Sequence, residues 1–236
     1  MSWFPDVALG QEFEPGVRLE RRALLAGAVG AIGLAAAPPP RARARAASDV
    51  DAFLDQAAAL AKTLDLNKDK AEDGYLFRLA SLLCDTAEGP GDPWGGIDDG
   101  VRFHGHGVRK LEPPRHLRAI QIGFGPGAKI PIHDHRDYNG VILCLEGDMH
   151  CRNFDVIEEG QGKDVVLRES VDALLTPGRF STLATTRDNL HELVAGPKGA
   201  RVLDVFTYFE KGATSRYLEF QDGEAPGERL SLARWR

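Results

Sequence analysis

The chain has 236 residues, of which 43% are hydrophobic and 27% charged, and its formal net charge at pH 7 is −6. This length suffices for one domain with a sizeable core, or for one domain and a tail. The acidic balance argues against a nucleic-acid-binding protein, because such a protein usually presents a basic face.

Residues 1–46 are predicted to be a leader that is not part of the fold. Arg21 and Arg22 precede an apolar run, residues 23–37, and three prolines and a stretch of alternating arginines and alanines follow it. This order matches the charged, apolar and cleavage regions of a secretory signal, and the arginine pair resembles that of a twin-arginine signal. The apolar run is short and rich in alanine and glycine, so we expect no stable membrane insertion.

The leader predicts export to the periplasm or the extracellular space, with cleavage near residues 44–46. Its removal would take away six basic and four acidic side chains and change the net charge from −6 to −8. An uncleaved N-terminal anchor and a wrongly assigned start codon are the alternatives. If this stretch is not a signal, we expect a cytoplasmic protein.

Residues 47–100 are predicted to form two helices and a loop that pack on the rest of the domain. Apolar side chains recur at helical spacing over residues 48–64 and again over residues 71–86. Cys84 falls on the apolar face of the second helix, which predicts a core cysteine. The glycine- and proline-rich stretch 88–100 then interrupts the periodicity and predicts a loop.

Over residues 101–236 the period of the apolar residues changes to two, which predicts β-strands. Short apolar segments are separated by turns with glycine and proline, a pattern typical of an antiparallel jelly roll. The predicted fold is therefore mainly β, a double-stranded β-helix barrel preceded by two α-helices. The expected strands cover residues 117–124, 128–133, 140–146, 149–156, 163–168, 171–176, 180–185, 191–195, 200–207 and 216–220.

His133 and His135 stand one residue apart at the start of an apolar strand, in the stretch GAKIPIHDHRDYNGVILCLEG. Side chains at positions i and i+2 of a strand point to the same face, so both imidazoles are expected to project into the barrel. Two imidazoles on one face are the beginning of a metal site. The spacing from Gly127 through the histidine pair to Gly147 resembles the first sequence motif of the cupins.

A third ligand must come from a distant strand. His191 begins the apolar segment HELVA and lies where the second cupin motif places its histidine. Cupins usually carry a carboxylate shortly after the pair, but residues 136–140 offer only Asp137, which is too close to the pair, so we predict a site of three histidines alone. Three neutral imidazoles leave a divalent metal its full charge and several open coordination positions. Such a metal attracts a thiolate and leaves a position for O2, and Fe(II) is the metal that performs this chemistry.

The wider sequence resembles the cysteamine dioxygenase and plant cysteine oxidase family of thiol dioxygenases. The resemblance covers roughly residues 70–222 and rests on P-x-H-D-H, an L-x-G hairpin, N-x-H and L-D-V, which occur in this order. It implies a cupin fold, Fe(II) held by His133, His135 and His191, and the addition of both atoms of O2 to a thiol sulfur to give a sulfinate. The implied substrates are small thiols such as cysteamine and cysteine, or a peptide with an N-terminal cysteine.

The same resemblance implies roles for two further residues. Asp204 is the aspartate of the L-D-V element, near the active site, where it could orient the groups around the metal. Tyr208 is a second candidate catalytic residue, although it is displaced relative to the family's proline-rich turn and tyrosine. This displacement puts the choice of substrate in question, but not the metal. Arg136, Tyr138 and Arg152 could line the mouth of the barrel and pair with a substrate carboxylate, or they could lie on the surface.

Two other functions are compatible with three histidines. A different cupin dioxygenase would bind a β-diketone or an enediol through two oxygen atoms in place of the thiolate. A non-catalytic cupin would bind a metal or a ligand without turnover, for example as a thiol sensor outside the cytoplasm.

The remaining histidine pair and two cysteines allow narrower predictions. His104 and His106 form a second H-x-H, but their flanking glycines predict a loop or a strand edge without a metal. Cys144 and Cys151 would face each other if residues 147–148 formed a two-residue hairpin turn, at a Cα separation of about 5.5 Å, which a disulfide can span. A disulfide and two reduced cysteines in the barrel wall are both compatible with this pattern.

Overall fold

The computed structural model covers both predicted helices and most of the predicted barrel. Residues 1–39, which make up most of the predicted leader, lie outside the described residues, and so do His104 and Arg136. Of His106 only the backbone is described. The described residues are 40–64, 71–88, 92–97, 102–103, 106–111, 117–135, 137–208, 215–222 and 229–236.

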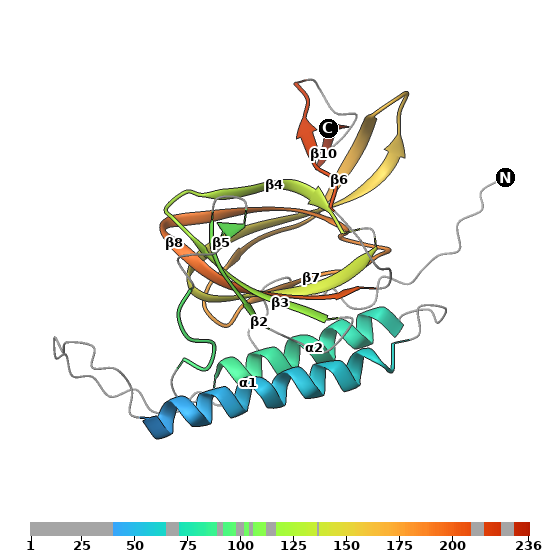
Figure 1. Ribbon diagram of the computed structural model, residues 1–236. Helices are drawn as coiled ribbons and strands as arrows, with labels where there is room; N and C mark the ends of the chain where they lie inside the picture. Colours follow the sequence, from blue (N-terminus) through green and yellow to red (C-terminus); the bar gives the residue numbers. More distant parts are fainter. Residues whose placement is uncertain are drawn as a thin grey trace.

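Two helices lie side by side against one face of a barrel of strands (Figure 1). They are α1 (Pro40–Ala61) and α2 (Ala71–Ala87), as the helical spacing predicted, although α1 begins inside the predicted leader. Their apolar faces pack on outward-facing side chains of the barrel, in a buried cluster that includes Cys84. The predicted core position of this cysteine is therefore confirmed. Among the described helices, none is long and apolar enough to cross a membrane.

Polar contacts also fix α2 on the barrel. The carboxylate of Glu72 accepts hydrogen bonds from Asn139 Nδ2 and from the backbone and hydroxyl of Thr185, each at 2.9 Å. Tyr75 and Thr207 share a buried hydrogen bond between their hydroxyl groups. Because buried polar groups need well-placed partners, these contacts set where the helix lies along the strands.

The strands form one antiparallel sheet that curls into the barrel. Along the sheet the order is β1-β2-β3-β8-β5-β6-β10-β9, with β4 paired to β8 and β7 paired to β5. The strands are β1 (Arg102–Phe103), β2 (His106–Leu111), β3 (Leu117–Phe124), β4 (Lys129–Asp134), β5 (Tyr138–Glu159), β6 (Asp164–Leu175), β7 (Phe180–Leu183), β8 (Leu190–Tyr208), β9 (Leu218–Phe220) and β10 (Leu230–Trp235).

Two long strands, β5 and β8, take part in both walls of the barrel. The first half of β5 pairs with β7 and the second half with β6, whereas β8 pairs first with β4 and then with β3. β5 and β8 also pair with each other over both halves, from Tyr138↔Tyr208 to Phe154↔Leu190. This is the two-walled arrangement of a double-stranded β-helix, and it confirms the predicted fold.

The predicted hairpin turn at residues 147–148 is wrong. β5 continues through these residues, with a register shift on either side. Gly147 has a φ of 69°, and a Cβ at this position would lie 2.1 Å from the carbonyl oxygen of Gly199 in β8. A glycine is therefore required because the two long strands approach closely, and not because the chain turns back.

The two cysteines of β5 are consequently not partners. Cys144 pairs with Val202, and Cys151 lies between Leu193 of β8 and Ala173 of β6. Both cysteines are buried and free, so of the two alternatives for this pair the reduced one holds.

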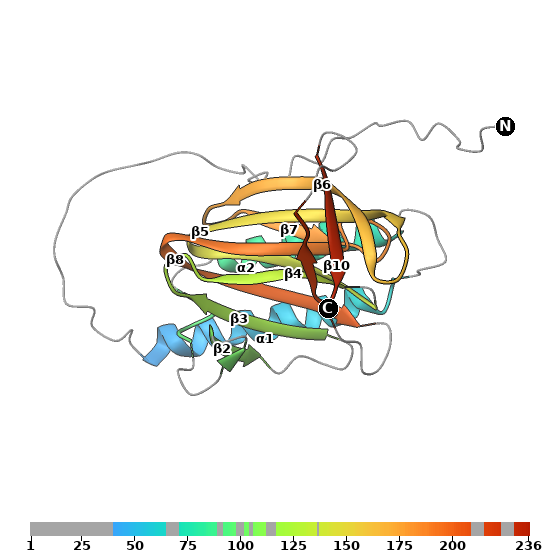
Figure 2. The ribbon, with the colours of Figure 1, turned by 90° about the horizontal axis from the view of Figure 1, so that it is seen from above.

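Other strand predictions differ in the same way. The segments predicted over 163–168 and 171–176 form one strand, β6, and those over 191–195 and 200–207 form one strand, β8. The sequence patterns did not predict β1, β2 or β10. The pair β9–β10 lies beside the end of β4 that carries the histidines (Figure 2), where His133 forms an isolated β-bridge with Tyr217.

Candidate metal centre

The three predicted ligands meet at one end of the barrel interior. His133 lies near the end of β4, His135 follows directly after that strand, and His191 is the second residue of β8. His133 and His191 are direct cross-strand partners in the β4–β8 ladder. The antiparallel pairing of these strands therefore brings together two residues that are far apart in the sequence. All three side chains are buried.

Their Nε2 atoms converge. Nε2 of His133 lies 3.2 Å from Nε2 of His135 and 3.1 Å from Nε2 of His191. A metal ion about 2.1 Å from each nitrogen would separate two neighbouring ligand nitrogens by about 3.0 Å in octahedral and about 3.4 Å in tetrahedral geometry. The observed separations fall within this interval, so the cluster fits a metal ion. Among the described residues, this is the only group of three or more histidine, cysteine or carboxylate side chains so arranged.

Burial disfavours the charged form of two of the imidazoles, and the neutral form is the one that binds a metal. Burial lowers the pKa of His135 and of His191 well below the ordinary value, and the neighbouring histidines lower it further. Nδ1 of His133 donates a hydrogen bond to the carbonyl oxygen of Pro131 at 2.9 Å, which leaves its Nε2 lone pair facing the cluster. Nδ1 of His135 and Nδ1 of His191 are buried and have no hydrogen-bond partner within the described part of the chain. With the protons of all three imidazoles on Nδ1, three Nε2 lone pairs would face a common centre, where a cation would remove their mutual repulsion.

Aromatic rings enclose the cluster. Tyr138 stacks on His135 with 4.3 Å between ring centroids, and Phe206 contacts the same imidazole at 5.5 Å. The ring of Tyr217 lies 5.4 Å from that of His133. These rings exclude water from one side of the site, which strengthens electrostatic interactions within it. Of the residues predicted to line the mouth, Tyr138 thus lies at the site.

Tyr208 lies one ring further from the histidines. Tyr208 stacks on Tyr138, with ring centroids 5.1 Å apart. The guanidinium of Arg118, a residue of β3, lies 5.4 Å from the centroid of the Tyr208 ring. Burial raises the pKa of Tyr208. Its side chain is only partly buried, so it stands at the rim of the site.

Asp204 faces the barrel interior from β8. Its side chain is buried, its Oδ1 has no hydrogen-bond partner among the described residues, and burial raises its pKa well above the ordinary value. The negative charge of an ionised Asp204 would raise the pKa of Cys151, Tyr138 and Tyr208, which places this carboxyl among them. The structure therefore brings the three histidines and Tyr138 together at one end of the barrel, with Tyr208 at the rim and Asp204 facing the same interior.

Further polar side chains line the interior on β5 and β7. The thiol of Cys151 donates a hydrogen bond to Asn153 Oδ1 at 3.1 Å, and Asn153 Nδ2 donates to Ser181 Oγ at 3.1 Å. Asn153 is the cross-strand partner of His191. Arg152 points the other way, because its guanidinium pairs with Glu169 outside the barrel.

The sequence patterns missed one set of contacts at the site. Asp134, between the two paired histidines, is buried and binds Arg216, a residue just before β9. The alternation of strand side chains predicts only that Asp134 faces away from the histidines. In the sequence, most of the barrel strands lie between Asp134 and Arg216, so no local pattern identifies Arg216 as the partner.

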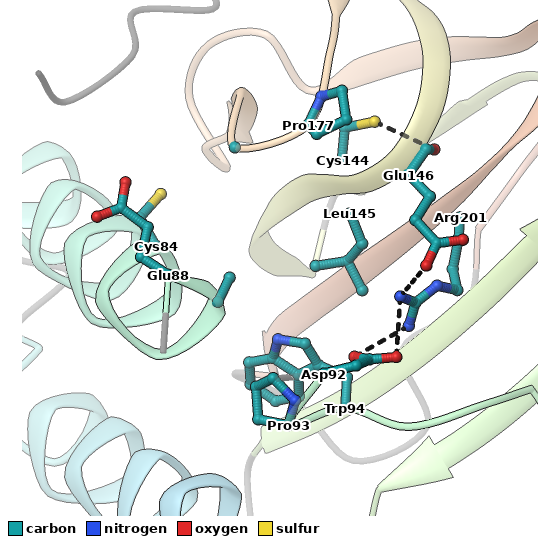
Figure 3. A pocket seen from close by; sticks show the side chains of 12 residues that line it. Cys84, Glu88, Asp92, Pro93, Trp94, Cys144, Leu145, Glu146, Pro177 and Arg201 are labelled. Carbon is teal, nitrogen blue, oxygen red and sulfur yellow. Dashed lines mark hydrogen bonds and ion pairs between the residues drawn. The ribbon is translucent and has the colours of Figure 1, made fainter. Parts of the chain in front are cut away.

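A separate cavity lies between the end of α2 and the first half of β5 (Figure 3). Its volume is about 340 Å³, and its lining includes Cys84, Cys144 and Trp94. Arg201 at its edge pairs with Asp92 and with Glu146. Burial raises the pKa of each of the two thiols to about 12, so neither is a ready metal ligand or nucleophile.

The sequence matches no family model and no curated protein. Among solved structures, the chain is similar to KdgF from Halomonas sp., at 17% identity over 49% of this chain and 90% of that chain, with a TM-score of 0.36. An RmlC-like cupin from Shewanella frigidimarina NCIMB 400 shows 24% identity over 50% of this chain and 87% of that one, with a TM-score of 0.36. Oxalate oxidase in complex with glycolate shows 15% identity over 52% and 59%, with a TM-score of 0.39.

These values are too low to bear on the reaction, and the fold class rests on the strand order and register. The described part of the chain is a double-stranded β-helix barrel preceded by two helices, and its buried cluster of three histidines fits a metal ion.

Proposed function

We propose that this protein is an Fe(II)-dependent thiol dioxygenase. The observation that supports this most is the ligand set, three neutral imidazoles with no carboxylate in the cluster. When bound, Fe(II) would supply the affinity for a thiolate and the electron transfer that O2 chemistry requires. The overall reaction joins RSH and O2 to give RSO2⁻ and H⁺, with both oxygen atoms on sulfur, and sulfur loses the four electrons that O2 gains.

The protein's own residues would hold the metal and shape the cavity around it. His133, His135 and His191 are the proposed ligands, and Tyr138 and Phe206 exclude water beside His135. Burial raises the pKa of Asp204, and its Oδ1, which has no partner among the described residues, could exchange a hydrogen bond with a substrate. Tyr208 at the rim would contact the part of the substrate that lies outside the barrel.

The proposed substrates are a small thiol, such as cysteamine or cysteine, or a peptide with an N-terminal cysteine. From the predicted leader we further propose that the protein acts outside the cytoplasm after twin-arginine export. That route would allow iron to be loaded before translocation.

The test is oxygen uptake by the iron-loaded full-length protein with a panel of cysteamine, cysteine, 3-mercaptopropionate and a Cys-initiated peptide. We expect uptake with one class of thiol, a sulfinate product by mass spectrometry, and loss of both in His191→Ala. An iron-bound protein that consumes no O2 with any of these thiols would sink the proposal. Uptake with a β-diketone panel instead would identify the other dioxygenase class.

A further inference from the structure

Arg216 binds the back of the histidine strand. Asp134 lies between His133 and His135, and its side chain points away from the cluster. Its Oδ2 accepts a hydrogen bond from Arg216 Nε at 2.7 Å and lies 2.7 Å from Nη2, and its Oδ1 accepts one from the Arg216 backbone N–H at 2.7 Å. The backbone N–H of Asp134 donates in turn to the carbonyl oxygen of Arg216 at 2.9 Å. The carboxylate that receives these bonds is buried.

The guanidinium of Arg216 is held from its other side as well. Its Cζ lies 4.0 Å from the ring centroid of Trp235, the last residue of β10. Trp235 is fixed in turn by pairing with Leu218 of β9 and by a backbone hydrogen bond to Lys163. A planar guanidinium placed between an indole ring and a carboxylate keeps a defined orientation, which a lysine could not reproduce.

The neighbours of Arg216 contact the same site. Ser215 Oγ shares a hydrogen bond with the hydroxyl of Tyr138, the residue that stacks on His135. The ring of Tyr217 lies against that of His133. The tripeptide 215–217 therefore contacts the site at three successive positions.

The histidine strand is held along both edges. The register between β4 and β8 shifts just before His133, where the pairing with β8 resumes. Beyond the end of β4, the backbone N–H of His135 donates to the carbonyl oxygen of Asn189 at 2.9 Å. On the edge opposite β8, Asp134 is bonded to Arg216. The C-terminal segment therefore supplies the contacts of the one edge of this strand that β8 does not cover.

We propose that Arg216 is a positioning residue for the metal ligands: through Asp134 it sets the orientation of His133 and His135, and β10 supports it through Trp235. This inference rests on the metal site of the proposed function. The proposal predicts that Arg216 and the β9–β10 hairpin control metal affinity without contributing a ligand. Groups that orient metal-bound histidines typically change metal affinity about 10–100-fold when they are removed.

The test is an anaerobic Co(II) titration of the metal-free full-length protein, followed by the visible absorption bands of the bound ion. We expect Arg216→Ala and Asp134→Asn to raise the Kd for Co(II) about 10–100-fold and to alter the bands. Arg216→Lys should recover only part of the affinity. The matched control is Arg234→Ala, which removes an arginine of β10 that pairs with Asp164 and not with the histidine strand.

Kd values within twofold of the parent in both Arg216→Ala and Asp134→Asn, with unchanged bands, would overturn the proposal. If either variant does not fold, Arg216→Lys and Trp235→Ala carry the same test, because both leave the buried carboxylate in place. Folding is checked by circular dichroism at the titration temperature, so that a loss of stability is not mistaken for weaker binding.

The titration uses neither thiol nor O2, so it separates this proposal from the reaction. If the parent protein binds no Co(II), the metal site itself fails, and both proposals fail with it. If the parent binds Co(II) and His191→Ala does not, but the Arg216 variants equal the parent, only the positioning role is lost.

Discussion

Two regions of the barrel contain side chains that can bind metals or react with electrophiles. These side chains differ in kind, imidazoles in one region and thiols in the other, and in what burial does to their reactive form. At the histidine cluster the reactive groups are neutral imidazoles whose Nε2 atoms face one another. In the cavity at the end of α2, the side chains are the thiols of Cys84 and Cys144. Burial raises the pKa of each thiol to about 12. Arg201 at the rim of that cavity is already paired with Asp92 and Glu146.

The comparison shows that burial has opposite effects on the two kinds of ligand. Burial disfavours the charged form of any group. For a histidine the form that remains is the neutral one with a free lone pair, which binds metals. For a cysteine the form that remains is the protonated thiol, which does not. The histidine cluster is therefore the site suited to a metal ion, and the cavity lined by Cys84 and Cys144 is not.

The largest expected effect is the loss of metal in His133→Ala and His135→Ala. Each substitution removes one of three ligands, so we expect no stoichiometric Fe(II) to remain after loading and desalting, as measured by inductively coupled plasma mass spectrometry. Cys84→Ala is the control from the other region and should keep its metal. Retention of iron by His135→Ala would show that the converging nitrogens are not the site.

The next effect concerns the thiols. With a pKa of about 12, roughly one thiol in 10⁴ is ionised at pH 8, against about a quarter for an ordinary cysteine. Labelling of Cys84 and Cys144 by a disulfide reagent should be on the order of 10³-fold slower in the folded protein than in urea. An exposed cysteine introduced as Leu174→Cys provides the rapid reference. Rapid labelling of Cys144 in the folded state would place the second region among the reactive ones.

A third prediction concerns Asp204 and pH. Because its pKa in the folded state is raised by burial, the unfolded chain releases this proton first as the pH rises above about 4. The contribution of Asp204 to the free energy of unfolding therefore falls as the pH rises, and this decrease is absent in Asp204→Asn. The variant's advantage in unfolding free energy should grow by up to about 1.4 kcal/mol per pH unit, as measured by urea titration of metal-free protein at pH 4.5 and 6.5.

The control for this prediction is Asp164→Asn. The pKa of Asp164 is lowered, chiefly by its hydrogen bond with Arg234, so its contribution to stability is present above the unfolded pKa and is lost as the pH falls. This loss occurs below about pH 4, so Asp164→Asn should keep a constant difference from the parent between pH 4.5 and 6.5, whereas Asp204→Asn should not. An advantage of Asp204→Asn that stays constant with pH would mean that Asp204 is charged in the folded protein.

The smallest effect is expected for Arg201→Ala in the second region. Arg201 binds Gln121 Oε1 and the carbonyl oxygen of Gly95, and the side chain of Gln121 is fully buried. Loss of these partners should lower the free energy of unfolding by about 1–2 kcal/mol. The Kd for Co(II) should not change, since the arginine lies away from the histidines. A weaker metal site in this variant would show that the two regions are coupled.

The sequence predicted the local features of this protein well. Alternation of apolar residues located most strands, and helical spacing located α1 and α2. The direction of His133 and His135 was also predictable, because side chains at i and i+2 share a face. Each of these inferences depends on residues within one element, whereas His191 was added from its resemblance to a known family motif.

What failed depends on residues far apart in the chain. The halves of β5 read as a hairpin because Gly147 and Asp148 are typical turn residues, whereas the close approach of Gly199 is the reason for Gly147. In the same way, Asp134 reads as an ordinary outward-facing residue until Arg216 is known to lie beside it. A local pattern states which face a residue occupies, but not what covers that face.

The position of β8 in the sheet also determines how the chain reaches its native state. β8 pairs with β3, β4 and β5, so that Leu117, for example, must find Thr207. Ladders between such distant segments form slowly, because much chain entropy is lost before the contacts compensate for it. A growing chain therefore cannot close this barrel until Tyr208 has been synthesised. Until then the apolar inner faces of β3 and β5 are exposed, and either chaperones or rapid synthesis and folding must prevent their aggregation.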